Sequence, residues 1–185
     1  ENFLRLQNFD EISPSEEEIK FICEIIKELE TSKIELTEKR SEVTIDNVVD
    51  RLIKDEKFQE IFQQNYDEEV EFISANFSEI LQDQREKLKT LSVNTIERII
   101  TNDNLQLENE DELLKFINEL YNESREYSIL YGYVYFCNVE ISTIEEFVNT
   151  FNINDMNQST WESISTRLKE EINKKSGEPI NIKYI

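Results

Sequence analysis

The sequence contains no histidine, which is the commonest general base and metal ligand in proteins. Catalytic sites of the Ser-His-Asp or Cys-His type and zinc sites that use histidine are therefore excluded. The two cysteines, Cys23 and Cys137, lack the spacing and the number that a four-thiolate zinc site needs. Both lie in apolar helical patterns, which predicts buried free thiols in a reducing, cytoplasmic compartment; a disulfide would require the fold to bring them together.

Glycine and proline are also scarce, with two of each in 185 residues. Because tight turns and β-hairpins consume glycine, this shortage favours helices joined by Asn, Ser and Asp links. The isolated glycines, Gly132 and Gly177, exclude a dinucleotide-binding or phosphate-binding glycine loop. The best frame for a calcium-binding EF-hand loop starts at Asp155 and has Thr160 where glycine is required. We therefore predict no cofactor and no metal.

Basic residues are half as numerous as acidic ones, with 20 Lys and Arg against 41 Asp and Glu, and the net charge is −21. This surplus would repel phosphate backbones and anionic lipids, so we expect no nucleic-acid and no membrane partner. The acids are dispersed along the chain, which favours solvated outer faces of helices. The alternative is an acidic surface that mimics nucleic acid. No apolar run approaches a membrane span, and the first residues have no signal-peptide character.

Adjacent carboxylates such as Glu68 and Glu69 are frequent, but an acid and base pair must lie in a pocket that separates the two pKa values. Acids near the first turn of a short helix are more simply explained as partners of the helix dipole. We therefore expect a protein that is not an enzyme.

The spacing of the apolar residues predicts an all-α fold of short antiparallel helical pairs, with at most a minor strand in the C-terminal tail. Thr44 and Ser92 are expected to cap helices, and Asn109, Ser142 and Ser159 each precede a Glu at capping-box spacing. A polar break is expected at 65–69, and 82–90 is either a helix end or a loop. The predicted helices span 14–30, 46–54, 55–66, 70–81, 93–101, 109–121, 127–136, 142–150 and 160–172.

One face of each predicted helix supplies the expected core of the C-terminal half. Trp161 is also expected in that core, since Ile164 and Leu168 follow it at helical spacing; a binding hot spot is the alternative. The aromatic residues of 127–136 cover more than one face, which predicts a central buried helix, with a peptide-binding groove as the alternative. The expected core residues are Ile96, Ile99, Leu113, Phe116, Ile117, Leu120, Leu130, Val134, Phe147 and Leu168.

The order of these blocks between 91 and 168 resembles the BACK domain that follows BTB domains. The segment EYSILYGYVYF at 126–136 is similar to the "EYS-LL-YV-F" helix of divergent protist BTB–BACK-like proteins, and 161–168 resembles their closing helix. The segment TIDNVV at 44–49, followed by 57–62, resembles the helical pair at the end of a BTB domain. The strand-rich half of a BTB domain, which carries the usual BTB dimer surface, has no counterpart here.

The resemblance implies that 1–66 is the C-terminal part of a BTB domain, that 67–173 is a BACK-like helical domain, and that 174–185 is a tail or the start of a following domain. It also implies an adaptor or scaffold that binds protein partners, among them a cullin-family scaffold of a ubiquitin ligase. The alternative is a helical structural subunit of a larger assembly without a ubiquitin role. The partner and the oligomeric state do not follow from the sequence.

Adaptors of this type hold their partner beside the junction of the two domains, here about 67–81. Phe72 and Phe77 are five residues apart, so a single helical stripe is not expected to bury both rings, and one of them is a candidate contact. Glu68 and Glu69 are expected to be exposed acids beside it. We therefore predict a partner-binding surface that consists of Glu68, Glu69, Phe72 and Phe77.

Overall fold

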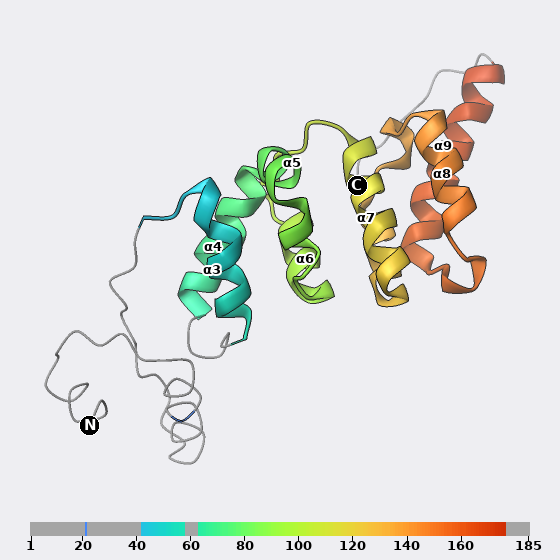
Figure 1. The fold of residues 1–185 in the computed structure, drawn as a ribbon. Coiled ribbons are helices and arrows are strands. Elements are labelled where there is room, and N and C mark those ends of the chain that lie inside the picture. Colours follow the sequence, from blue (N-terminus) through green and yellow to red (C-terminus); the bar gives the residue numbers. More distant parts are fainter. Residues whose placement is uncertain (1–20, 22–41, 58–62, 177–185) are drawn as a thin grey trace, which may run out of the picture. The chain divides into compact units, whose positions relative to one another are not determined.

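The computed structural model of the chain describes residue 21 and the ranges 42–57 and 63–176 (Figure 1). All regular secondary structure in these residues is helical and none is a strand, so the predicted all-α class is confirmed. None of the helices in the described ranges has the length and apolar character that crossing a bilayer demands. The predicted helix 14–30, apart from Phe21, the predicted terminal strand and Cys23 lie outside the described residues.

The chain divides into two compact units, residues 1–72 and residues 73–185. The division falls inside helix α4 (Gln63–Ala75), and the domain junction predicted after residue 66 lies in the same helix. Each unit is described by itself.

Unit one contains helix α3 (Ile45–Glu56), which starts after Thr44 as the capping pattern predicts. The backbone N–H of Thr44 donates to Oδ1 of Asn47 at 3.0 Å, so the first turn is closed by a reciprocal cap. The helix then buries one face fully, through Val48, Val49 and Leu52.

Helix α4 runs straight through the polar break that we predicted at 65–69, so that prediction is wrong. Tyr66 and Val70 are one turn apart and both buried, which continues an apolar face across the polar residues. Glu69 is buried between them because Arg51 pairs with it. Glu69, one of the polar residues that indicated a break between helices, is thus part of the packed face of α4.

Unit two begins with α5 (Phe77–Leu88), α6 (Val93–Ile100) and α7 (Glu110–Glu123). The predicted helix 70–81 is interrupted at Asn76, where φ is −126° and ψ is 25°. Helix α5 continues to Leu88 with a kink at Gln84, so the charged segment 82–90 is mostly helical.

The predicted caps of α6 and α7 are confirmed. Oγ of Ser92 accepts the N–H of Thr95 at 3.3 Å, and Oδ1 of Asn109 accepts the N–H of Glu112 at 2.9 Å. These side chains satisfy N–H groups that have no partner within the first helical turn.

The carboxylates at the start of α7 have structural partners. Glu110 accepts the backbone N–H of Tyr135 at 3.2 Å, and Asp111 accepts that of Glu140 at 3.0 Å. Burial raises the pKa of Glu110, while the hydrogen bond from Tyr135 acts in the opposite direction. The acidic first turn of α7 therefore anchors the segment that follows the aromatic residues.

The aromatic segment is built from 3₁₀ turns, η1 (Arg125–Tyr133) and η2 (Phe136–Asn138), and the α-helix predicted over 127–136 is wrong in type. With three residues per turn, Tyr127 and Leu130 lie on the same side, and both are buried. Tyr131 is buried as well, whereas Tyr133 is 38% and Tyr135 69% exposed, so the predicted burial of the segment on several faces is confirmed only in part.

The unit ends with α8 (Ile141–Thr150), η3 (Ile153–Asp155) and α9 (Gln158–Ser176). The caps predicted at Ser142 and Ser159 are wrong, because both residues lie inside the first turn. For α9, Oδ1 of Asn157 accepts the N–H of Thr160 at 2.8 Å, so an asparagine two residues earlier takes the capping role.

The predicted core of this unit is confirmed with one exception. Leu168 is 51% exposed, and the prediction that Trp161 is core is also wrong, since that side chain is 55% exposed. The confirmed core residues are Ile96, Ile99, Leu113, Phe116, Ile117, Leu120, Leu130, Val134 and Phe147.

Tyr131 lies at the centre of an aromatic cluster. Its ring centroid is 5.6 Å from that of Tyr121, 5.0 Å from that of Phe147 and 5.1 Å from that of Phe151. Its hydroxyl donates to Oδ1 of Asn118 at 2.8 Å, which satisfies both buried polar groups. Burial raises the pKa of Tyr131 well above its ordinary value of 10.0.

We predict that this tyrosine makes the fold sensitive to alkali. The folded chain keeps the Tyr131 proton at a pH where the unfolded chain loses it, so its contribution to the free energy of unfolding is intact below pH 10.0 and declines above it. Urea unfolding at about pH 8 and about pH 11 measures the decline. A Tyr131→Phe variant should lose less stability over this interval than the parent chain; an equal loss would contradict the assignment.

We also predict that the core positions are sensitive to truncation. Phe116→Ala or Leu130→Ala should lower the free energy of unfolding by about 2–5 kcal/mol, because each leaves a cavity in a packed interior. Urea denaturation provides the measurement. Val148→Ala, at a position that is 66% exposed, serves as the control and should change it by less than about 0.5 kcal/mol.

Candidate functional site

The structure exposes some residues of the predicted partner surface and buries others. Glu68 is exposed, but Glu69 is fully buried, which corrects our expectation that both acids face solvent. Nε of Arg51 lies 2.8 Å from Oε1 of Glu69, and the Arg51 side chain is only 18% exposed. A carboxylate so enclosed is neutralised within the fold and offers nothing to a partner.

The two phenylalanines of the predicted surface also differ. Phe77 is 1% exposed, and its ring meets that of Phe116 edge to face, with 6.4 Å between the centroids. It is therefore a core residue. Phe72 is half-buried, so Glu68 and part of Phe72 are what the predicted set presents to solvent.

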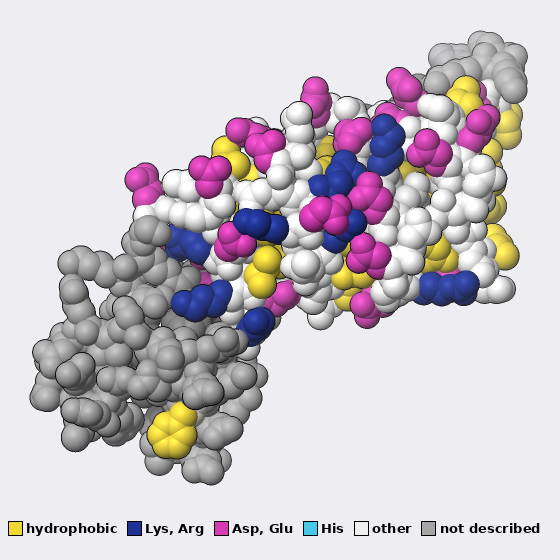
Figure 2. All heavy atoms as spheres, viewed as in Figure 1, with side chains coloured by type: hydrophobic (Ala, Val, Ile, Leu, Met, Phe, Trp, Pro, Cys, Tyr) yellow, Lys and Arg dark blue, Asp and Glu magenta, His cyan; other side chains and the backbone are white. Residues whose placement is uncertain are grey.

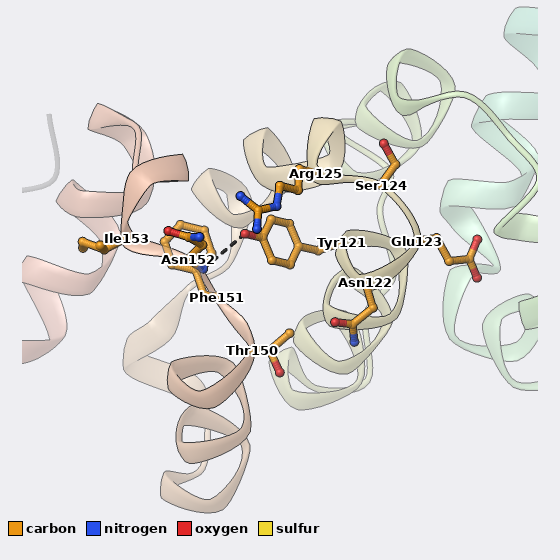
Figure 3. A pocket seen from close by; sticks show the side chains of 9 residues that line it. All are labelled: Tyr121, Asn122, Glu123, Ser124, Arg125, Thr150, Phe151, Asn152 and Ile153. Atoms are coloured by element: carbon orange, nitrogen blue, oxygen red, sulfur yellow. Dashed lines mark hydrogen bonds between the residues drawn. The ribbon is translucent and has the colours of Figure 1, made fainter.

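An open groove of about 770 Å³ lies at the C-terminal end of α7 (Figure 3). The hydroxyl of Tyr121 donates to the Asp155 carboxylate and accepts the backbone N–H of Asn152 at 3.1 Å. Nη1 of Arg125 is 3.7 Å from Oδ2 of Asp155. The groove is lined by Tyr121, Asn122, Glu123, Ser124, Arg125, Thr150, Phe151, Asn152 and Ile153.

These polar groups act on one another. Burial, followed by the hydrogen bond to Asp155, raises the pKa of Tyr121, so the phenol holds its proton. The same hydroxyl joins the end of α7 to Asn152 and Asp155 in the link between α8 and α9. We interpret the cluster as a clamp that fixes this link, because the Tyr121 hydroxyl is bonded both to the Asp155 carboxylate and to the backbone of Asn152.

A second surface arises from the way in which α9 is attached. Ser163 donates its hydroxyl to the carbonyl of Val134, and Nη1 of Arg167 donates to the carbonyls of Phe136 and Val139. These three carbonyls belong to η2 and the residues that flank it. Polar side chains of helix α9 thus bind it to the aromatic segment.

Gly132 allows the first turn of α9 to approach this segment closely. A Cβ atom at position 132 would lie 2.7 Å from Oγ of Ser159, which is closer than such atoms can come. Ser159 donates its hydroxyl to the carbonyl of Gly132 at 3.3 Å, and the neighbouring Thr160 is fully buried. The polar side of α9 is therefore its inner side.

The apolar side of α9 consequently faces solvent. Trp161 is 55% exposed, Leu168 51% and Ile172 64%, and Ile164 between them is half-buried. At about 100° per residue these positions share one side of the helix. We call the four residues the α9 stripe.

Helix α8 exposes apolar residues as well. Ile141 is 70% and Val148 66% exposed, and they lie seven residues apart on one side, whereas Thr143 and Phe147 face the core. In Figure 2 hydrophobic side chains reach the surface along the edge that α8 and α9 form in this view. A large share of the exposed apolar side chains in the described ranges thus belongs to these two helices.

Comparison with protein-family models, with curated proteins and with solved structures finds no match to this chain. Within the described ranges no group of three or more His, Cys, Asp or Glu side chains is arranged to hold a metal ion. The surface of the molecule itself is therefore the basis for assigning a function.

The division of Glu68 and Glu69 leads to a paired prediction. Glu69→Lys should lower the free energy of unfolding by about 3–5 kcal/mol, because it places a second cation at a fully buried position beside Arg51. Glu68→Lys, one position earlier and exposed, should change it by less than about 0.5 kcal/mol. Urea denaturation compares the two; similar effects would show that Glu69 is not enclosed.

Proposed function

We propose that this chain is a non-enzymatic protein–protein interaction module and that the α9 stripe is its contact surface. The observation that carries the proposal is the exposure of Trp161, Leu168 and Ile172 by more than half on one side of a helix whose polar side packs inward. A single exposed apolar side chain is ordinary, but a continuous stripe of large ones is a feature of interaction sites.

The stripe matches a known mode of recognition. Apolar residues spaced three, four and seven apart allow an amphipathic helix to insert its side chains into a groove or to pair with another helix. Burial of a large apolar side chain contributes about 1.5–3 kcal/mol, and tryptophan is enriched among residues that dominate binding. Trp161 is therefore the expected anchor of the contact.

The finer proposal is an adaptor or scaffold of the BTB–BACK type that binds a cullin-family protein. Its support is the resemblance of 44–49, of 126–136 and of 161–168 to that family, and the comparisons add no further support. A helical subunit of a larger assembly is the alternative. The exposed α9 stripe suits both, because each needs a protein partner.

Photo-crosslinking tests whether the stripe is a contact surface. A photoreactive phenylalanine analogue at position 168 should form a discrete covalent adduct with another polypeptide in the native cell extract, because a bound partner would cover that side chain. The same analogue at the exposed Asn149 of α8 is the control and should form none. If neither position forms an adduct, the stripe is not a contact surface.

A purified cullin separates the two finer alternatives. If the chain is a BTB–BACK adaptor, it should bind an immobilised cullin, and binding should survive Val148→Asp, which changes an exposed residue away from the stripe. An adduct at position 168 without cullin binding would favour a subunit of another assembly.

A further inference from the structure

We propose that the α9 stripe binds the α9 stripe of a second copy of this chain, with the two helices antiparallel, so that the module is a symmetric homodimer. This inference rests on the proposed function, since it names the partner of the same surface.

The positions of the apolar residues are self-complementary. Trp161 and Ile172 lie at equal distances on either side of the midpoint between residues 166 and 167, and Ile164 and Leu168 lie equally about residue 166. Rotation of one helix by 180° about an axis near this midpoint places Trp161 against Ile172 of the second copy and Ile164 against its Leu168. The largest side chain thus meets a smaller one, and every contact occurs twice, as in a two-fold symmetric interface.

The charges beside the stripe favour the same arrangement. Glu162 and Lys169 are seven residues apart, so they lie on one flank of the helix, and both are exposed. In the antiparallel pair each Glu162 faces Lys169 of the second copy, because the midpoint of these two positions also lies near residue 166. Such exposed pairs contribute little to affinity, but they select the orientation of two paired helices.

The inner side of α9 keeps this surface available. Ser163 and Arg167 are bonded to carbonyls of the same copy, so the helix cannot rotate its apolar side inward without breaking those bonds. Repulsion between two chains of net charge −21 opposes association, and salt screens it. The dimer should therefore strengthen as the salt concentration rises, the opposite of a complex held by charge attraction.

Sedimentation equilibrium of the full chain tests the proposal. The expected mass is that of two chains of 22.1 kDa each. Leu168→Asp should weaken the dimer about 100-fold or more, because it buries two carboxylates in the paired stripes. Val148→Asp is the matched control, since it introduces the same charge at an exposed apolar residue of α8, and it should leave the mass unchanged. Circular dichroism checks that both variants keep the helical content of the parent.

A charge exchange tests the antiparallel orientation independently. Glu162→Lys should weaken the dimer about tenfold, because the new lysine of each copy then faces Lys169 of the other copy. The double variant that combines Glu162→Lys with Lys169→Glu should restore the parent affinity. Each interface contact between positions 162 and 169 then again joins a lysine to a glutamate. A single variant that is not rescued would overturn the antiparallel pairing.

The remaining outcomes distinguish this inference from the proposed function. A monomer whose position 168 crosslinks to a different protein would overturn the homodimer and leave the interaction module intact. A monomer that crosslinks to nothing would overturn both, as expected if residues of the same chain cover the stripe. A dimer that is indifferent to Leu168→Asp would place the interface elsewhere and overturn the inference.

Discussion

The attachment of α9 by donors to main-chain carbonyls is the constraint on which the surface of unit two depends. The carbonyls of Val134 and Phe136 each accept a main-chain N–H within the segment, and a carbonyl oxygen has a second lone pair that can accept another donor. Ser163 and Arg167 supply the donors, and an arginine is suited to this because its guanidinium carries five N–H groups in a fixed plane. Once this side of α9 faces inward, Trp161 and Leu168 have no place in the core.

Sequence patterns predicted the helices of unit two well where local rules and packing agree. Ser92 and Asn109 cap their helices as expected, and the apolar faces of α6 and α7 are buried. The patterns were insufficient where two local solutions compete. Asn157 and Ser159 can both cap α9, and their spacing to later residues does not decide between them. The choice of 3₁₀ turns over an α-helix at 125–133 likewise depends on tertiary contacts.

The predicted site shows a different limit of sequence analysis. Glu68 and Glu69 are chemically identical neighbours, yet one is exposed and the other is fully buried. Glu69 lies on the packed face of α4, where Arg51, 18 residues earlier in the sequence, pairs with it. A composition with an excess of acids predicts solvated faces in general, but it cannot show which carboxylate has a buried cation within reach. For the same reason the sequence could not separate the exposed from the buried residues of the surface predicted at 67–81.

The exposed stripe could not be inferred from periodicity, because periodicity shows that a helix is amphipathic and not which side faces the core. For most helices of a globular unit, apolar spacing identifies the buried side, and this rule correctly located Phe116 and Leu130. Helix α9 does not follow this rule because Gly132 has no side chain. Ser159 can therefore approach its backbone more closely than a Cβ atom at position 132 would permit. That close approach brings a polar side of the helix against the aromatic segment. Exposing large apolar side chains to water is unfavourable, and packing within the unit does not account for it. A protein partner that covers the stripe does.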